Sequence, residues 1–552
     1  MNAKTKIGLE IVEAALLLGL LGNALLRATP WGLNVLLWTG ALCCAMIALT
    51  LRRKRELWGR SSIALHSALI VFASFVAWRD SLILQSLDVL VILALLAILS
   101  LPALNVNAQA AGFFEYALGA ISSAFNAAIA PFVLVFGDIE WKTIPRRGWT
   151  KHALAIVRGL AIVAPILLVF CVLFMAADAV FEGIVKNTFR LEPEIVFTHV
   201  FLFAFFAWIS AGYLRGAMFG SLLNNGASSD FPANNASIIN PGQAAGAGAN
   251  SSANESLNSA QINDLPKEKD LVDYLPNFLR LGAVEVSVVL GLINLLFLSF
   301  VIVQLRYFFG GMDFVQTTEN FKLADYARRG FFELCWVAGL TLPILLTTHF
   351  LLVKNDSLSQ KLFRVLSAVN VGLLFIIMYS AVNRMLLYTG NLGYGLTEMR
   401  FYPTAFMFWL ALVFAWFGLT VLRGQAKNFA WGALWTALFV VAGLHVLNPD
   451  NFIARHNLYL MKQGRSFDSY YMRELSDDAV PGLTNSLPEM TFEQQCVLKS
   501  EFRRRLENNG TQDFRTFNLA RWTARRTLLN HEGGFETINC PAWSQSHRDD
   551  EF

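Results

Sequence analysis

The chain has 552 residues, of which 55% are hydrophobic and 15% charged, and its mean hydropathy is +0.47. Because soluble domains are about 25% charged, this composition excludes a set of water-soluble globules. It predicts instead an all-α polytopic transmembrane helical bundle whose first partner is the lipid bilayer. The formal net charge of +4 lacks the basic excess of nucleic-acid-binding proteins, so no nucleic-acid partner is expected.

Eleven apolar segments are long enough to span a membrane, since about 20 apolar residues cross the ~30 Å hydrocarbon core. In chain order they cover residues 8–26, 31–51, 61–78, 81–101, 153–176, 195–219, 282–306, 331–353, 365–388, 402–422 and 429–447. A twelfth segment, 112–136, is less apolar, because it contains Glu115 and Asn126 and ends near Pro131. The bundle is therefore predicted to have about 11–12 helices.

The basic residues predict the side on which each loop lies, because Arg and Lys near helix ends favour the cytoplasm. The densest short basic loop, 52–60, is placed inside, and the N-terminus with it. If 112–136 does not cross, four further basic loops also fall inside, at 142–151, 220–280, 354–364 and 423–427. We therefore predict that 112–136 does not cross and that the C-terminal region lies outside. A crossing 112–136 reverses the side of those four loops and of the C-terminal region.

The composition divides the chain into four parts. These are an N-terminal transmembrane bundle at 1–220, a disordered Asn/Ser/Ala/Gly-rich linker at 221–270, a C-terminal transmembrane bundle at 271–447, and a soluble α-helical tail at 448–552. The linker has few large apolar residues and is not expected to form a core. The two bundles lack the matching broken helices that mark the inverted repeats of secondary transporters.

Capping residues predict the helices of the tail. Asn448 and Pro449 begin a helix that should end at Gly464. Thr491 and Gln494 form a capping box for the next helix, which should end at 509–510. The last helix should follow Thr511 or Asp513, and its expected apolar contacts are Leu519, Trp522, Leu528 and Leu529.

Two of the six cysteines, Cys496 and Cys540, lie in the polar tail. If the tail faces an oxidising compartment, these two can form one disulfide, although the sequence does not supply the distance that the bond requires. The other four cysteines lie inside apolar segments.

Two carboxylates are candidate functional residues at membrane depth, where an ionised side chain costs about 2.5–3.5 kcal/mol on insertion scales. Asp88 lies well inside its apolar segment, so it should either pair with a neighbouring helix or face a wet cavity. Glu285 lies near the inner end of its segment, where it either lines a pathway or has a structural role.

A rim of charged residues is predicted at the outer ends of the membrane segments. Its candidate members are Arg306, Arg329, Glu333, Arg384, Glu398, Arg400 and Asp178. One interpretation is a belt of interfacial salt bridges. The other is a vestibule that binds an anionic or zwitterionic headgroup or solute through Arg306, Arg384 and Arg400, since Arg recognises phosphate and carboxylate well.

The sequence lacks the common catalytic and metal-binding motifs. H-E-x-x-H, paired C-x-x-C, G-x-x-x-x-G-K-[ST] and G-x-S-x-G are all absent. His199, His349 and His445 each stand alone in an apolar segment, which is typical of structural histidines. We predict no catalytic residue, no metal and no cofactor. The first outer loop, 27–31, also lacks the carboxylate expected of a membrane glycosyltransferase.

Several segments resemble an uncharacterised family of bacterial multi-pass membrane proteins, the domain of unknown function 4173 group. The resemblance runs from about residue 150 to 530, and its segments are 177–181 (ADAVF), 304–311 (QLRYFFGG), 325–333 (DYARRGFFE), 394–400 (YGLTEMR), 448–455 (NPDNFIAR), 477–481 (DDAVP) and 517–521 (FNLAR). It implies a helical bundle with a helical tail in the bacterial cytoplasmic (inner) membrane. It implies no established activity and no catalytic residues.

Three functions are compatible with these features. The first is an envelope sensing or binding protein whose outer rim and tail recognise a lipid, a glycan or an envelope protein. The second is a transporter or permease, supported by Asp88 and Glu285. The third, a lipid-modifying enzyme, is supported only by the charged rim, so the sequence favours a protein that is not an enzyme.

Overall fold

The computed structural model of the chain describes residues 2–52, 59–104, 106–141, 193–222, 280–309, 323–353, 356–386, 389, 395–508, 513–531 and 540. All regular elements within these ranges are helices, as the all-α prediction requires. Ten of the described helices are long and apolar enough to cross a membrane, and Arg60–Val76 is apolar but shorter. The chain is therefore a multi-pass helical membrane protein.

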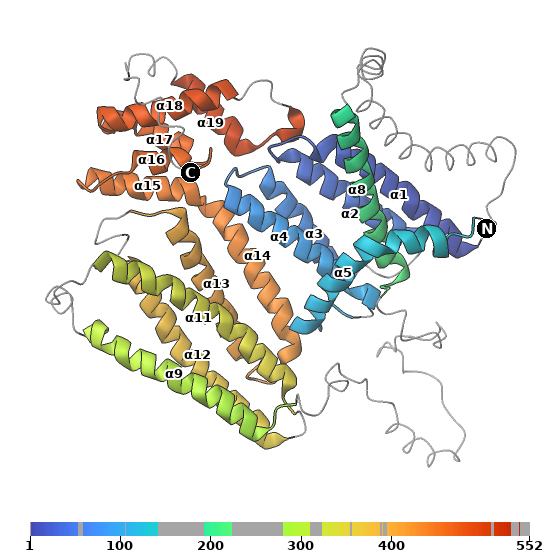
Figure 1. Cartoon of the computed structure of the whole chain (residues 1–552), viewed down its shortest axis with the longest axis horizontal. Coiled ribbons are helices and arrows are strands. Elements are labelled where there is room, and N and C mark those ends of the chain that lie inside the picture. The colour runs from blue at the N-terminus through green and yellow to red at the C-terminus, as the bar shows by residue number, and fades with distance from the viewer. Residues whose placement is uncertain are drawn as a thin grey trace, which may run out of the picture. The chain divides into compact units, whose positions relative to one another are not determined.

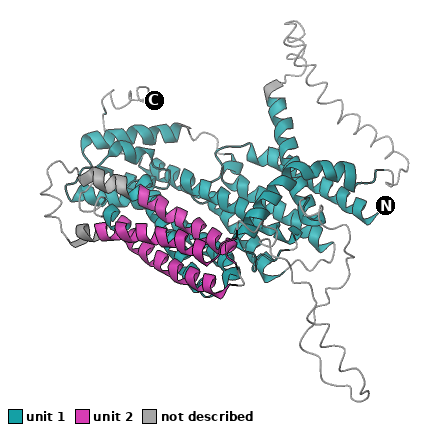
Figure 2. Ribbon diagram, turned by 60° about the horizontal axis from the view of Figure 1, so that its bottom comes forward, with its two compact units in different colours: residues 1–225, 324–332, 382–552 teal, residues 226–323, 333–381 magenta. Residues whose placement is uncertain are grey.

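The chain forms two compact units (Figure 2), one containing residues 1–225, 324–332 and 382–552, the other 226–323 and 333–381. The first unit holds α1 (Ala3–Leu26), α2 (Leu33–Leu51), α3 (Arg60–Val76), α4 (Leu82–Leu99), α5 (Phe113–Val133), α8 (Pro193–Phe219), α13 (Glu398–Thr420) and α14 (Phe429–Leu447), which Figure 1 labels. Helices α13 and α14, which the sequence assigns to the C-terminal bundle, thus share a unit with the N-terminal helices.

The second unit contains α9 (Ala283–Phe309) and most of α11 (Leu323–Leu351) and α12 (Ser357–Leu386). Two buried amides join α9 to α12. The side-chain amide of Asn370 donates to Oδ1 of Asn294 at 2.9 Å, and that of Asn294 donates to the Leu366 carbonyl at 2.9 Å. Amides buried among apolar helices need such partners.

Ten of the eleven predicted spans coincide with described helices. The eleventh, 153–176, lies outside the described residues, and so does 223–270 of the predicted linker. The sequence places the start of two helices poorly, because α11 begins at Leu323 and α12 at Ser357, each eight residues before the predicted 331 and 365.

Both ends of α5 lie at the same end of the first unit. Because α1 to α4 follow one another through short connections, the start of α1 and the end of α4 lie on one side. Near the start of α5, the Tyr116 hydroxyl donates to the Ala108 carbonyl at 2.7 Å, just after α4. Just beyond the end of α5, Asp138 forms an ion pair with Lys4 at the start of α1, at 2.7 Å.

Figure 1 shows the same arrangement, with α5 running from the end of α4 to the start of α1. Length and composition alone would allow α5 to cross a membrane. Its contacts at both ends instead agree with the expectation that 112–136 does not cross.

Small residues bring α1 and α8 into close contact. A Cβ atom on Gly19 would lie 2.8 Å from the Phe203 carbonyl oxygen, and one on Gly22 would lie 2.5 Å from Cγ of Phe206. Small residues at a helix interface allow this approach of two backbones in a membrane. We infer that these glycines determine the distance between α1 and α8.

Replacing Gly19 by leucine should force α1 and α8 apart and destabilise the protein by about 1–3 kcal/mol, the usual cost of overpacking. The melting temperature of the detergent-purified chain checks this result. Gly40→Leu on α2 is the matched control, because a Cβ atom at Gly40 has nothing within 4 Å. An equal loss of stability in both variants would contradict the assignment.

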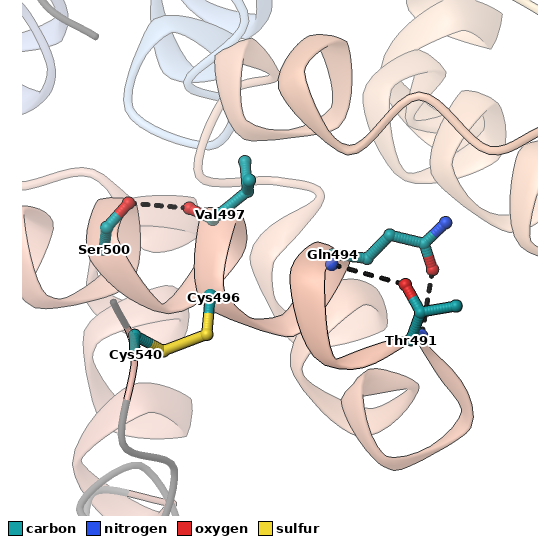
Figure 3. Close-up of a disulfide and its surroundings, with 6 residues drawn as sticks. All are labelled: Thr491, Gln494, Cys496, Val497, Ser500 and Cys540. Atoms are coloured by element: carbon teal, nitrogen blue, oxygen red, sulfur yellow. Dashed lines mark hydrogen bonds between the residues drawn. A yellow bond between two sulfur atoms is a disulfide. The ribbon is translucent and has the colours of Figure 1, made fainter. Parts of the chain in front are cut away.

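The tail consists of α15 (Pro449–Lys462), α16 (Ser469–Glu474), α17 (Val480–Asn485), α18 (Phe492–Asn508) and α19 (Leu519–Asn530). Two of its predicted caps are confirmed. The Asn448 side chain accepts from the Asn451 amide. Thr491 and Gln494 each accept from the other's amide, at 3.4 and 3.0 Å, as a capping box requires (Figure 3).

The predictions for the last helix are right only in part, because Asp513 caps a 3-10 turn at Phe514–Thr516 but the α-helix begins later. Helix α19 begins at Leu519, because the Asn518 side chain caps it by accepting from the amides of Ala520 and Arg521. Only Leu528 of the four expected apolar contacts is buried, at 1% exposure, whereas Leu519, Trp522 and Leu529 are more than 40% exposed. The small residues Ala520 and Ala524 take the buried positions instead.

A disulfide joins Cys496 on α18 to Cys540 (Figure 3). The two Cα atoms are 5.5 Å apart, within the range in which cysteines can be bridged. Cys496 is fully buried, so the bond ties the chain after α19 to the core of the tail. An oxidising outer compartment for the tail remains a prediction.

Candidate functional site

The tail is bound tightly to one end of the first unit's membrane helices. The amide of Leu519 donates to the Ala77 carbonyl at 2.8 Å, and the amide of Leu33 donates to the Phe517 carbonyl at 2.9 Å. The Asn518 side chain donates to the carbonyls of Val76 and Arg79, at 3.0 and 2.8 Å. These contacts lie at the end of α3 and the start of α2, opposite the end of α2 and the start of α3. The tail is therefore a part of the first unit, docked on the ends that the sequence predicts to be outer.

Arg79 connects the tail to a membrane helix. Its guanidinium donates to Oδ1 of Asp478 at 2.9 Å and to the carbonyl of His445 in α14 at 2.8 Å, and it stacks over the Trp78 ring. Asp478 also accepts from the amide of Asp80 at 2.7 Å. One cation thus holds the connection between α3 and α4, the end of α14 and the tail in fixed positions.

A cavity of about 600 Å³ lies where the tail meets the membrane helices. Five carboxylates from different elements line it: Asp80, Glu398, Asp450, Glu474 and Asp477. Arg504 and Arg505 of α18 form another part of the wall, and Leu82, Ile83 and Leu475 supply apolar surface. We call it the acidic cavity. Membrane helices and tail helices both contribute to it, so it exists only when the tail is docked.

Four segments on which the family resemblance rests meet around the acidic cavity. Segment 394–400 contributes Glu398, segment 448–455 contributes Asp450, and segment 477–481 contributes Asp477. Segment 517–521 contributes Arg521, whose Nε lies 3.2 Å from Oδ1 of Asp80. Residues that are far apart in the sequence are thus brought to one place.

Burial and mutual repulsion perturb the carboxyl groups of the cavity. Burial, with repulsion from Asp477 and Asp478, raises the pKa of Asp80 to about 7 against the opposing effect of Arg521. Burial also raises the pKa of Asp450 and of Asp477. These buried carboxyl groups are therefore harder to ionise than carboxyl groups in water, and titratable groups with perturbed pKa values are typical of functional sites.

The cations of the wall already have carboxylate partners. Arg505 donates to Asp477 at 2.7 Å and to Glu501 at 2.9 Å, and it also donates to two backbone carbonyls. Arg504 forms a two-pronged ion pair with Glu501. These two arginines act as fixed parts of the wall.

A buried polar pair lies in the membrane part of the same unit. Nε2 of His445 in α14 lies 3.0 Å from Oδ2 of Asp88 in α4, and both side chains are 0% exposed. Phe75 stacks on the imidazole ring with centroids 4.4 Å apart, and Nδ1 contacts the Val441 carbonyl at 2.9 Å. Of the two alternatives predicted for Asp88, the structure shows the first, a partner on a neighbouring helix. The sequence missed His445 as that partner because 357 residues separate the two.

Glu398 aside, the structure describes Arg400, Glu285, Glu333 and Arg384 among the predicted site residues, and their gathering into one site stays a prediction. Arg400 donates to the Gly395 carbonyl at 2.7 Å, so it holds its own loop. Glu285 accepts from the Gly282 amide at 3.0 Å and caps the start of α9. Glu333 is exposed and Arg384 is half-buried. Asp178 lies outside the described residues, as do the side chains of Arg306 and Arg329.

Sequence reasoning missed most of the acidic cavity. Of its carboxylates, the sequence singles out only Glu398 as a site residue, and it assigns Glu398 to the mixed-charge rim. The signal that could have found the rest is the series of acidic residues beside predicted helix ends, such as Asp80 and Asp450. Within the described ranges, no group of three or more His, Cys, Asp or Glu side chains is placed to hold a metal ion.

These features define a class: a multi-pass helical membrane protein whose helical tail closes an acidic cavity at one end of its bundle. The family model named Domain of unknown function (DUF4153) matches residues 66–486, and the chain belongs to this family. The prediction of an uncharacterised family is right, but the family is DUF4153 rather than the 4173 group. The match includes Asp80, Asp88, His445 and Asp450. Neither a curated protein nor a solved structure matches the chain.

Proposed function

We propose that the protein is an envelope binding or sensing protein of the bacterial inner membrane, and that its ligand site is the acidic cavity on the outer side. The observation that carries this proposal is the shared construction of the cavity, because membrane helices and tail helices each supply carboxylates to it. A ligand bound there would contact both parts at once. The partner would be an envelope solute, and of the predicted rim residues that the structure describes only Glu398 lines the cavity that would recognise it.

The connection through Arg79 supports a sensing role. Arg79 donates hydrogen bonds to Asp478 and to the backbone carbonyl of His445. Asp478 follows the cavity residue Asp477 in the chain. The imidazole of His445 in turn contacts Asp88 inside the bundle. A ligand that shifts the tail by a small distance would therefore act on a buried polar pair. Elements that can pack in two alternative arrangements commonly transmit ligand binding to a distant part of a protein.

Cysteine labelling in spheroplasts tests the proposal. In a chain whose span cysteines are replaced by alanine, Glu474→Cys should react with a membrane-impermeant maleimide. The low-molecular-weight fraction of a periplasmic extract should slow this reaction. Glu493→Cys, on an exposed position of α18 outside the cavity, should react without protection, and Lys427→Cys, between α13 and α14, should react only after lysis.

Two results would contradict the proposal. A Glu474→Cys chain that reacts only after lysis would place the cavity on the inner side. A reaction that the extract fraction slows neither at Glu474→Cys nor at Leu82→Cys, an exposed cavity position without a charge, would mean that no envelope solute occupies the cavity.

A transporter or permease is the second candidate function, and the buried pair of Asp88 and His445 favours it. Ionisable pairs inside membrane helices are typical of proton and ion pathways. Proton or solute flux in liposomes tests this alternative. A flux that Asp88→Asn abolishes in protein with unchanged melting temperature would favour transport, and unchanged flux would reject it.

A further inference from the structure

We propose that the ligand of the acidic cavity is a linear aliphatic polyamine, an elongated molecule with two or more ammonium groups separated by methylene chains. This inference rests on the proposed function, because it names the ligand class of the same site. It is argued from the charges, the buried acceptor and the apolar surface of the cavity.

Some carboxyl groups of the described cavity wall have no cation beside them. Among the described residues, no Lys, Arg or His lies within ion-pair distance of the carboxylates of Glu398, Asp450 or Glu474. By contrast, Asp477 pairs with Arg505 and Asp80 with Arg521. In the described part of the chain, three carboxyl groups of the cavity therefore have no cation beside them, and a cationic ligand would supply one.

The cavity also has a buried hydrogen-bond acceptor. Asp450 is 1% exposed, and its Oδ2 accepts from the hydroxyl and the amide of Ser476. In the described part of the chain Oδ1 of Asp450 accepts no hydrogen bond, although the Ser81 hydroxyl is near enough to lower the pKa of this carboxyl group. An unsatisfied buried carboxylate oxygen is costly. An N–H donor that carries a positive charge satisfies this oxygen best.

The arrangement of the cavity carboxylates favours a polyamine over a metal ion. A metal requires several oxygen ligands around one point, and the described side chains contain no such group. The carboxylates are instead distributed around a cavity of about 600 Å³. Leu82, Ile83 and Leu475 also line the cavity and give it apolar surface. Spaced ammonium groups match the distributed carboxylates, and methylene chains match the apolar wall.

The arginines of the cavity wall favour a polyamine over an anion such as a phosphate headgroup. Arg504 and Arg505 are the cations of the wall, and both are already bound to carboxylates. An anion would have to displace Glu501 or Asp477 and would then face Glu398, Asp450 and Glu474. Like charges at such short range oppose binding.

Calorimetric titration of spermidine into the full-length protein in neutral detergent tests the inference. Wild-type protein should bind spermidine at one site. Asp450→Asn should weaken binding about ten- to hundredfold, the effect of one charged hydrogen bond. Glu474→Gln at an exposed position should also weaken it and remains informative if Asp450→Asn does not fold. The matched control Glu493→Gln should bind like wild type.

Monoamine and metal titrations complete the test. Butylamine should bind far more weakly than spermidine, because one ammonium group leaves two carboxylates unmatched. Magnesium chloride at the spermidine concentration should not displace spermidine. Equal binding of spermidine to wild type and to both cavity variants would overturn the inference, and so would displacement by magnesium.

The two proposals fail separately. Absence of spermidine binding, with Glu474→Cys still protected by the extract fraction, would reject the polyamine and leave the binding function intact. Absence of both would reject the two together. Spermidine that itself protects Glu474→Cys in spheroplasts supports both.

Spermidine affinity should fall as the pH decreases through about 7. Asp80 has a pKa raised to about 7, so at lower pH it gains a proton and loses its charge. The groups that face Asp80 are Asp477 and Asp478 from the segment before α17, Arg521 from α19, and the adjacent Arg79. Once Asp80 is neutral, the charge of Arg521 is less compensated and opposes the amine, which stays protonated. Calorimetry at pH 5.5 and 8 checks this prediction, and equal affinities would contradict it.

Discussion

A double-mutant cycle between Asp88 and His445 is expected to show strong coupling. His445→Leu should destabilise the protein by about 1–3 kcal/mol, the cost of leaving a buried polar group unsatisfied, and by more where Asp88 stays ionised. The reason is that Oδ1 of Asp88 already accepts no hydrogen bond in the described part of the chain. His445→Leu removes the partner of Oδ2 as well. Asp88→Leu should cost a comparable amount, because Nε2 of His445 is left buried without it.

The double variant Asp88→Leu/His445→Leu should be more stable than either single variant, since a buried polar pair can often be replaced by apolar residues at little cost. Chemical denaturation in mixed micelles measures all four proteins. Additive losses in the double variant would show that the two side chains do not depend on each other, contrary to the observed contact.

Arg79→Met should have the second large effect, a loss of about 3–5 kcal/mol, because it leaves a buried charge without its partner. The side chain of Asp478 is 2% exposed, and Arg79 is its cation. The variant also removes the bond to the His445 carbonyl. We expect the tail to loosen, so that trypsin cleaves it at protease concentrations that leave wild type intact.

Lys462→Met is the matched control for this prediction. Lys462 pairs with Glu489 on the surface of the tail, and both side chains are about half exposed. Exposed pairs contribute about 0–1 kcal/mol, so this variant should resist trypsin like wild type apart from the lost cleavage site. Equal sensitivity of the two variants would contradict the role of Arg79.

The membrane helices could be predicted from the sequence because apolar length is a local property. Apolar runs of about 20 residues identify them without any knowledge of packing. The caps at Asn448 and Thr491 could be predicted for the same reason, since each acts on the turn that follows it. Helix α19 shows the limit, because its cap at Asn518 also serves as a tertiary clamp on Val76 and Arg79.

The candidate site could not be predicted because it depends on contacts between distant segments. Asp80 and Asp450 each look like a polar residue at a helix end, and only the docking of the tail buries them together. The partnership of Asp88 with His445 arises because α14 packs against α4, although the sequence places the two helices in different bundles. Charge signs alone indicate the mixed-charge rim, which stays a prediction. In the described part of the chain, folding pairs the cavity arginines with carboxylates and leaves Glu398, Asp450 and Glu474 without a cation beside them.

We propose that the tail and the acidic cavity lie on the outer side of the membrane. C-terminal fusions test it most directly, with alkaline phosphatase in one strain and green fluorescent protein in another. If the tail lies outside, the phosphatase fusion should be active and the fluorescent-protein fusion should not fluoresce. An inactive phosphatase with a bright fluorescent protein would contradict it, because the cavity would then face the cytoplasm.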